Sequence, residues 1–437
     1  MLHIQDPAVN ALLLKGSFGL EKENLRVTPE GYLAHTPHPF PDNNNIVRDF
    51  GENQTEINTP VFSDAHEAVE ALMEYSCQIQ KILRDLPDRE ILWPFSNPPF
   101  IRNEQDIPVA RFFGKDVSKT VYREYLSDRY GRYKMTLSGI HVNYSFDEAL
   151  LRADFAAGKK SSSGSEENDF REYKNQFYVE LAEKTAAYGW ILTAVTAASP
   201  LMDSSFVEKG RFGVDEFSGM ASVRCSELGY WNTFAPVFDY SSLQSYADSI
   251  QAYVDEGLLA YPSELYYPVR LKPAGKNSLE SLRERGVNHI ELRMFDLNPL
   301  TEAGVDERDI VFAQLLLVWL AALPRRSFSK KDQVQAVQNF KNAAHYDLKT
   351  VKIVAPDGEV CSVAHAASGI IDEMKQFYQG YPDEVRKVLD FEEAKFVDAD
   401  NRYAWIIRRR FSGSFVEKGL QLAENLQKSM TSGKNLQ

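Results

Sequence analysis

The segment Gly19-Leu20-Glu21-Lys22-Glu23-Asn24-Leu25-Arg26-Val27 places two carboxylates two residues apart within strand-like sequence. Successive side chains of a strand alternate between its faces, so Glu21 and Glu23 project to the same side. Two acids at this spacing are also ordinary on the solvated face of an edge strand. A buried strand is favoured instead by the apolar residues around them, which are Phe18, Leu20, Leu25 and Val27.

Three further segments, far apart in the chain, place charged or polar side chains within strand-like sequence, and these are 49–56, 138–143 and 290–293. Alternation places His141 on the same face as Asn143. It likewise places Glu291 and Arg293 on the same face of their strand. Acids that share one face of a sheet repel each other unless positive charge lies between them. Divalent metal ions and an arginine would supply that charge, and together they indicate a site for a polyphosphate.

Each segment also has a simpler structural interpretation. Asp49 and Glu56 are seven residues apart and face opposite ways in a regular strand. Either Gly51 forms a bulge that resets the face, or one of the two acids is not a ligand. A lone histidine such as His141 is more often a hydrogen-bonded structural residue, and imidazole suits Mn²⁺ better than Mg²⁺. Glu291 could form only an ion pair with the nearby arginine, although its apolar strand favours a buried functional group.

A second group of residues is aromatic and basic. Arginine suits a substrate α-carboxylate through its two-pronged donors, and tyrosines can line a small amino-acid pocket. The segments concerned are 122–125, Arg224 with Tyr230, and 266–270. Ordinary packing remains the favoured explanation for any single tyrosine, because the chain has 21 of them.

Composition and motifs narrow the class of partner. The 62 acidic and 49 basic residues give a net charge of -13, which argues against a nucleic-acid partner but not against a nucleotide at a local metal site. The longest apolar stretch, 310–323, is too short to span a membrane, and the N-terminus lacks signal-peptide features. Three widely spaced cysteines predict a reducing cytosol. The sequence contains no P-loop, so any use of ATP is expected to proceed without one.

Hydrophobic periodicity predicts an α+β fold with an antiparallel sheet. Strands are expected over 133–145 and 287–296, and a small hairpin over 351–361. A helix is expected over 64–86, with Ser63 or Asp64 as its N-cap, and 146–196 is expected to be mostly helical around a mobile polar loop at 161–165. Further helices are predicted at 306–323, 331–345, 366–379, 383–396 and 414–430. We expect residues 1–305 to form the catalytic core and 306–437 a mainly helical region packed on it.

Taken in order, these segments resemble the bacterial glutamate–cysteine ligases, both the stand-alone enzyme and the ligase part of the bifunctional glutathione-synthesising protein. The resemblance covers about residues 16 to 306, and the C-terminal helices match only in character. The matching segments are 19–27, 49–60, 93–94, 130–131, 138–143, 198–200, 228–230 and 291–299.

The resemblance implies a glutamine-synthetase-like fold, in which a curved antiparallel sheet forms a funnel surrounded by helices. It implies ATP-dependent joining of the glutamate γ-carboxylate to the cysteine amine through a γ-glutamyl phosphate, with Mg²⁺ or Mn²⁺ as cofactor. This reaction is the first step of glutathione biosynthesis. The expected partners are therefore small-molecule substrates, with no nucleic acid and no membrane, and the expected location is the cytoplasm.

The resemblance also implies roles for individual residues. The metal ligands would be Glu21, Glu23, Asp49, Glu56, His141 and Glu291. Arg293 would contact the transferred phosphoryl group, and Asn143 would lie beside the nucleotide. Arg224 would bind a substrate carboxylate, and Arg123 would act where the substrates meet. The acceptor amino-acid pocket would be lined by Tyr122, Leu126, Met135, Tyr230 and Tyr266.

Two positions depart from the family pattern. Met135 stands where a glutamine is expected near the acceptor side chain, and Val142 stands where an aromatic residue is usual. Methionine makes the pocket more apolar and polarisable. A ligase that couples glutamate to a different amine is therefore the first alternative. A metabolite-binding homologue without turnover ranks lower, because all six predicted ligand positions keep residue types that can bind a metal.

Overall fold

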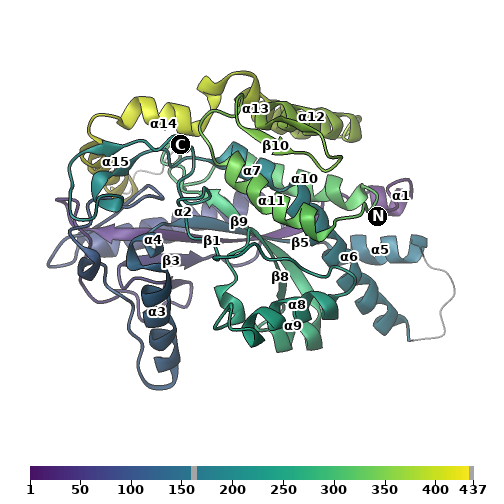
Figure 1. Cartoon of the computed structure of the whole chain (residues 1–437), viewed down its shortest axis with the longest axis horizontal. Coiled ribbons are helices and arrows are strands. Elements are labelled where there is room, and N and C mark those ends of the chain that lie inside the picture. Colours follow the sequence, from purple (N-terminus) through teal and green to yellow (C-terminus); the bar gives the residue numbers. More distant parts are fainter. Residues whose placement is uncertain (159–164, 433–437) are drawn as a thin grey trace.

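The computed structural model describes residues 1–158 and 165–432 of the chain. An antiparallel sheet with the order β2-β3-β1-β5-β9-β8 lies at its centre (Figure 1). Its strands are β1 (Gly16–Val27), β2 (Ile46–Arg48), β3 (Gln54–Asn58), β5 (Gly139–Phe146), β8 (Val269–Pro273) and β9 (Val287–Asp296), and β4 (Ile91–Leu92) pairs with the end of β1. The predicted α+β class is confirmed.

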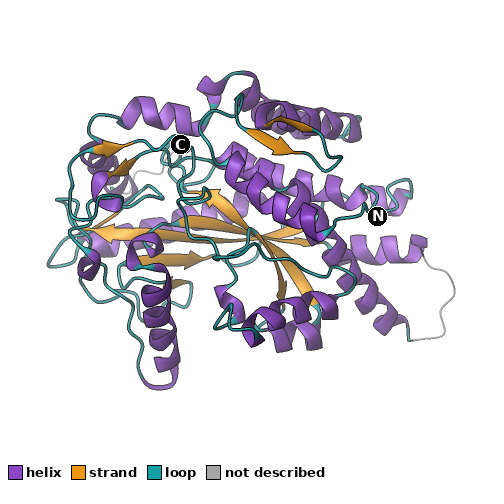
Figure 2. Ribbon diagram, in the orientation of Figure 1, coloured by secondary structure: helices purple, strands orange, loops and turns teal. Residues whose placement is uncertain are grey.

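Helices cover one face of this sheet (Figure 2). Helix α2 (Ala65–Arg84) packs on β1, and α6 (Glu166–Tyr188) and α7 (Trp190–Thr196) pack on β9. The strands supply alternate apolar residues to this contact, among them Leu20, Val142 and Leu292, which are at most 1% exposed. Because side chains alternate, the carboxylates of the same strands project from the opposite face.

A second layer of helices lies behind the first. Helix α10 (Glu307–Ala322) packs on α2, α6 and α7, and α11 (Lys330–Ala343) packs on α6 and α7. Almost all of α10 is buried, as its continuous apolar sequence predicts. Within the described residues, no helix combines the length and the apolar character needed to cross a bilayer.

The remaining elements lie around these layers. They are α1 (Pro7–Asn10), α3 (Val117–Tyr130), α4 (Arg132–Met135), α5 (Glu148–Gly158), β6 (Met202–Asp203), β7 (Asp215–Glu216), α8 (Leu243–Asp255), α9 (Leu279–Arg285), β10 (Lys352–Val354), β11 (Val360–Ser362), α12 (Val363–Phe377), α13 (Asp383–Val397), α14 (Tyr403–Phe411) and α15 (Phe415–Thr431). Helix α3 projects away from the sheet (Figure 1).

Most element predictions are confirmed. The strand at 287–296, the hairpin at 351–361, the helix at 64–86 with Asp64 as its N-cap and the five C-terminal helices are all present. The strand predicted over 133–145 is wrong in its first half, because Gly131 at φ 77° precedes a helical turn, α4, and β5 begins only at Gly139. Helix α14 was not predicted, and no side-chain cap marks its start. Residues 161–164 of the predicted polar loop lie outside the described residues.

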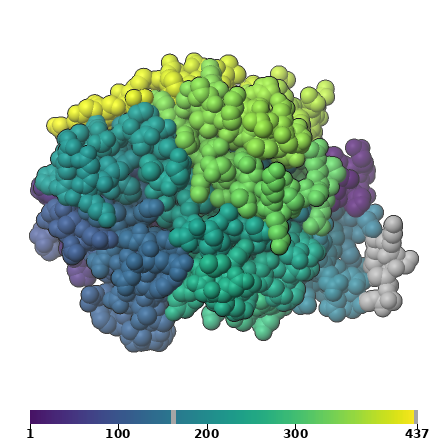
Figure 3. All heavy atoms as spheres, viewed as in Figure 1, coloured from purple at the N-terminus to yellow at the C-terminus, as the bar shows by residue number. Residues whose placement is uncertain are grey.

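The C-terminal helices share the core of the preceding part. Helix α15 packs on α2, and the ring of Phe415 lies edge-on to Trp93 with centroids 5.6 Å apart. Figure 3 shows the last helices lying along one edge of the molecular surface, against earlier parts of the chain. The proposed division at residue 305 stays a prediction.

Candidate active site

Three neighbouring strands each contribute one metal-ligating side chain to the open face of the sheet. Glu21 on β1 lies opposite His141 on β5, and Glu291 lies on the next strand, β9. His141 Nδ1 is 3.0 Å from Glu21 Oε2 and 3.7 Å from Glu291 Oε1. Ligand atoms of the three residues lie within 4.8 Å of one another. This row across the sheet can hold one metal ion.

A β-bulge shapes this row. Ile140 pairs with Phe295, but Val142 pairs with Leu292, so two residues of β9 lie opposite His141 alone. One of them is Arg293, whose Nη1 lies 3.2 Å from Glu291 Oε1. A bulge bends a strand and redirects its side chains. It brings the arginine, the carboxylate and the imidazole to one place.

The chemistry of the three side chains fits a divalent cation. Burial and the charge of Arg293 lower the pKa of His141 to about 4, so its imidazole is neutral at pH 7 and able to bind a metal. Although burial opposes ionisation, Lys272 and Arg293 hold the pKa of Glu291 well below its ordinary value. Glu291 Oε2 is buried and has no hydrogen-bond partner among the described residues. An ionised carboxylate oxygen in that situation is suited to a cation.

Three more of the predicted ligands lie beside this row. Glu23 on β1 is paired directly with Glu56 on β3, and Asp49 follows β2. Burial and the charge of Asp49 raise the pKa of Glu23 to about 8 and that of Glu56 well above its ordinary range. These carboxyls therefore resist ionising together, as expected where several carboxylates share a site without a cation between them.

Of the two alternatives given for Asp49 and Glu56, the bulge at Gly51 is not the arrangement found, because Gly51 lies where the chain turns between β2 and β3. Asp49 and Glu56 both reach the cavity because the chain reverses between β2 and β3, so that the two residues lie on neighbouring antiparallel strands or at their ends. The face rule for a single continuous strand does not apply across a hairpin.

A cavity of about 230 Å³ extends over these side chains. It is lined by 13 of the 15 predicted site residues, which are Glu21, Glu23, Asp49, Glu56, Tyr122, Arg123, Leu126, Met135, His141, Tyr230, Tyr266, Glu291 and Arg293. The other two, Asn143 and Arg224, are adjacent. Asn143 Nδ2 donates to Glu21 Oε1 at 3.0 Å, and Arg224 Nη2 lies 3.3 Å from His141 Nε2.

The guanidinium of Arg224 lies directly against the backbone of Gly139. Arg224 is 6% exposed, its Nη1 donates to the Phe295 carbonyl at 3.4 Å, and its Nε has no partner among the described residues. A Cβ on Gly139 would lie 2.3 Å from Arg224 Cζ, so only glycine leaves room for the guanidinium. The Gly139 amide also donates to Glu23 Oε2 at 3.0 Å.

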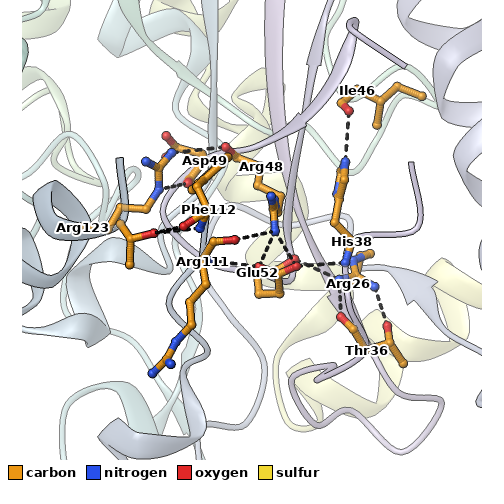
Figure 4. A network of polar contacts seen from close by, with 11 residues as sticks. Arg26, Thr36, His38, Ile46, Arg48, Asp49, Glu52, Arg111, Phe112 and Arg123 are labelled. Atoms are coloured by element: carbon orange, nitrogen blue, oxygen red, sulfur yellow. Dashed lines mark hydrogen bonds and ion pairs between the residues drawn. The ribbon is translucent and has the colours of Figure 1, made fainter. Parts of the chain in front are cut away.

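Arg123 connects helix α3 to the β2–β3 hairpin (Figure 4). Its guanidinium donates to the carbonyl oxygens of Asp49 and Arg48 and stacks over the ring of Phe112 at 4.8 Å. The hairpin turn itself is held by Glu52, whose carboxylate accepts from Arg48 Nη1 at 2.7 Å. Arg123 thus fixes the backbone that carries Asp49.

One side of the cavity, which carries the residues predicted for the acceptor pocket, is aromatic and apolar. The ring of Tyr266 packs edge-on against Tyr230 and Tyr130, with centroids 5.0 and 5.2 Å apart. Buried Glu264 accepts from the Tyr130 hydroxyl at 2.7 Å. Met135 is 6% exposed and belongs to the apolar cluster beneath this wall.

Sequence reasoning missed several residues that line the cavity, namely Phe50, Leu137, Ser263, Arg270, Lys272 and Asn277. A signal was present for two of them. Val269-Arg270-Leu271-Lys272-Pro273 has charges at alternate positions of an apolar strand, the same pattern that identified Glu291 and Arg293. Arg270 lies directly opposite Glu291 in the β8–β9 register.

Comparison with solved structures agrees with this fold. A glutamate–cysteine ligase from Francisella tularensis, solved in complex with AMP, superposes with a TM-score of 0.84 at 22% identity, covering 96% of this chain and 90% of that one. A bifunctional glutathione synthetase from Pasteurella multocida superposes with a TM-score of 0.80 at 26% identity, covering 98% of this chain and 54% of that one.

Sequence comparison identifies the family. The chain is 36% identical to the glutathione biosynthesis bifunctional protein GshAB of Listeria monocytogenes over 88% of its own length, and it spans about half of that relative. It is 31% identical to a glutamate–cysteine ligase of Clostridium acetobutylicum over 77% of this chain and 78% of the relative. The sequence model of the family described as glutamate-cysteine ligase matches residues 1–262 and 239–343. The chain belongs to the glutamate–cysteine ligase family.

Proposed function

We propose that the chain joins the γ-carboxylate of L-glutamate to the amine of L-cysteine, using ATP, as the first step of glutathione biosynthesis in the cytosol. The observation that carries the proposal is the row formed by Glu21, His141 and Glu291, with Arg293 beside it, in a cavity that also has an aromatic wall. The names of the relatives support the same reaction, and the free state of all three cysteines is consistent with a reducing compartment.

The proposed chemistry activates a poor electrophile. An oxygen of the glutamate γ-carboxylate attacks the γ-phosphorus of ATP, and ADP leaves with the electrons of the broken P–O bond. The cysteine nitrogen then attacks the acyl carbon, and phosphate leaves with the electrons of the C–O bond. The amine proton passes to the departing phosphate or to a carboxylate of the cavity, and we assign no general base.

The residues of the chain position the charged groups for this transfer. Arg293 would face the transferred phosphoryl group, and Arg224 would bind a substrate carboxylate. Asn143 would lie beside the nucleotide. Mg²⁺ or Mn²⁺, when bound by the carboxylates and His141, would supply positive charge that neutralises the phosphates. Such catalysis is mostly positioning and electrostatics, so the fixed cations of the sheet are the main contribution of the protein.

A second acceptor amine is favoured by one observation. Met135 lies in the cavity at the position where a polar side chain is expected, so the acceptor side offers an apolar thioether surface. A small apolar amino acid would fit such a wall as well as cysteine does.

Product analysis tests both candidates. The protein is incubated with glutamate, ATP, Mg²⁺ and a mixed amino-acid pool, and the products are identified by mass spectrometry while ADP release is followed for each amino acid alone. We expect γ-glutamylcysteine as the main product. A clear preference for another amine would reject cysteine as the substrate, and absence of any amine-dependent ADP release would favour a binding protein without turnover.

A further inference from the structure

Lys272 is held in the active site by a single ion pair. It lies on β8, two residues from Arg270, and on the face of the sheet that carries Glu291. Its Nζ lies 3.2 Å from Glu291 Oε1, and the lysine side chain is 13% exposed against 1% for the glutamate. Among the described residues, no other polar partner is recorded for this ammonium group.

The two neighbouring arginines are held in different ways. Arg270 donates to the backbone carbonyls of Ser263 and Leu265, so its guanidinium is anchored to a loop. Arg293, like Lys272, is paired with Glu291 Oε1 at 3.2 Å, but its guanidinium is planar and comes from the same strand as that carboxylate. A lysine has a flexible four-carbon stem and a compact charge, so Lys272 is the cation of this cluster that can change partner at least cost.

Lys272 and a divalent cation would compete for the same carboxylate. Glu291 belongs to the group of three side chains that can hold a metal ion, and its Oε1 already faces Lys272, Arg293 and, at 3.7 Å, His141. A divalent cation at this group would add two positive charges next to the ammonium of Lys272. The like charges repel, and the burial of Lys272 and Glu291 weakens the screening of this repulsion.

The ammonium that gives up Glu291 needs another anion nearby. Lys272 lines the cavity together with Arg270, Asn277 and Arg293, and the anions that the proposed reaction brings to this cavity are the phosphates of the nucleotide. A phosphate oxygen is a strong acceptor for a lysine ammonium.

We propose that Lys272 is an exchangeable counter-charge: it neutralises Glu291 when no divalent cation is bound, and moves to the nucleotide phosphates when the cation takes Glu291. This inference rests on the proposed ATP-dependent function. It assigns to a residue of β8 a positioning role that couples entry of the cation to capture of the nucleotide.

Direct binding of Mn²⁺ without nucleotide tests the first half. Electron paramagnetic resonance of free Mn²⁺ is used to titrate the wild type and the Lys272→Met, Lys272→Gln and Lys272→Arg variants. Loss of the competing charge should tighten Mn²⁺ binding about tenfold in both neutral variants, because the Coulomb repulsion is removed, and Lys272→Arg should stay close to the wild type. Lys349→Met removes an exposed lysine outside the cavity and should change nothing. Unchanged or weaker Mn²⁺ binding in the neutral variants would overturn the proposal.

Binding of a nonhydrolysable ATP analogue at saturating Mn²⁺ tests the second half. The neutral variants should bind the analogue about tenfold more weakly, with partial recovery in Lys272→Arg. Equal affinity would show that Lys272 does not move to the phosphates. Thermal unfolding checks that each variant is folded, and Lys272→Gln covers the case in which Lys272→Met is not.

These measurements need no turnover, so they are independent of the product analysis. If the wild type forms no ligated product but the neutral variants bind Mn²⁺ more tightly, the proposed function fails and the competition at Glu291 stands. If the wild type is an active ligase and Mn²⁺ affinity does not respond to Lys272, only this inference fails.

Discussion

Gly139 and Arg224 approach so closely that a Cβ on the glycine would lie 2.3 Å from Arg224 Cζ and 2.4 Å from its Nε. The atoms it would meet belong to the end of a flexible side chain, so the arginine would move rather than the strand. Strand β5 at Gly139 also carries the amide that holds Glu23. A single hydrogen atom in place of a methyl group therefore decides where the guanidinium lies.

Gly139→Ala should impair substrate binding more than folding. If Arg224 binds a substrate carboxylate as proposed, we expect the KM of that substrate to rise at least about tenfold, because the charged contact would be displaced, with a loss of about 1 kcal/mol or less in unfolding free energy. Steady-state kinetics with each substrate varied in turn, together with urea unfolding, measures both. Gly369→Ala is the matched control, because a Cβ at Gly369 meets nothing within 4 Å. An unchanged KM for every substrate would contradict the role of Arg224.

Glu291→Gln should abolish ADP release and leave the fold in place. The amide keeps the shape of the side chain but removes the charge that balances Lys272 and Arg293 and that would bind the metal. We expect kcat to fall at least about a hundredfold, since even residues that only support a metal ligand cost 10- to 100-fold. Circular dichroism monitors folding, and Glu280→Gln on the exposed surface of α9 serves as the control. Substantial remaining activity would refute the assignment of the site.

Lys22→Met should stabilise the protein at neutral pH. Lys22 projects from β1 toward α2, where its Nζ donates to Ser76 Oγ at 3.2 Å, and burial lowers its pKa from 10.5 to about 8. The folded state therefore binds its proton more weakly than the unfolded state, at a cost of about 3 kcal/mol that is present below pH 8 and disappears as the pH rises toward 10.5.

Removing the ammonium relieves this cost but loses one hydrogen bond, so we expect a gain of about 2 kcal/mol at pH 7. Urea unfolding at pH 7 and at pH 9.5 measures the gain, and the advantage of the variant should shrink at the higher pH. Lys349→Met should behave as the wild type at both values. A loss of stability at pH 7 would show that Lys22 has a favourable charged partner.

A buried cluster of charged residues lies between α10 and α13, and the stability of the protein should depend more on its lysine than on one of its two acids. Lys395 Nζ lies 2.8 Å from Asp309 Oδ1 and 2.7 Å from Glu392 Oε2, and all three side chains are at most 2% exposed. Burial raises the pKa of Glu392 well above its ordinary range, against the opposing charge of Lys395. Two acids thus share one ammonium group.

Lys395→Met leaves both acids without a counter-charge and should destabilise the fold by about 3–5 kcal/mol. Glu392→Gln removes the excess acid and should leave stability at neutral pH unchanged or higher. Because the raised pKa of Glu392 costs stability as the pH rises, the glutamine variant should gain relative to the wild type between pH 6 and 8. Differential scanning calorimetry at both pH values measures this. Equal losses of stability in Lys395→Met and Glu392→Gln would contradict the conclusion that two acids share one ammonium group.

The sequence is informative where a local pattern determines which side of a strand or helix a side chain occupies. Charges at alternate positions of apolar strands located Glu21, Glu23, Glu291 and Arg293, and a continuous apolar run located the buried helix α10. The pattern at Arg270 and Lys272 is equally clear, but nothing local shows that β8 lies beside β9.

What depended on chain reversal or tertiary contact could not be predicted. Asp49 and Glu56 share a cavity because of a hairpin, and a bulge that brings two residues of β9 opposite His141 is a property of strand pairing. The contact of Arg224 with His141 joins segments that local sequence does not relate. Local patterns single out Asp49, Glu56, His141 and Arg224 as candidates, but only the resemblance to a known family assigns them to one site.

The row across β1, β5 and β9 has a consequence for how the protein acquires its activity. Its members come from opposite ends of the first 300 residues and meet only after both long-range strand pairings have formed in the correct register. Such pairings form slowly, since a long stretch of chain must lose its freedom first. A slip of one residue in β5 would turn His141 to the helical side of the sheet. Cation binding is therefore a property of the completed fold. A bound cation would stabilise the correctly paired sheet relative to chains trapped with a wrong register.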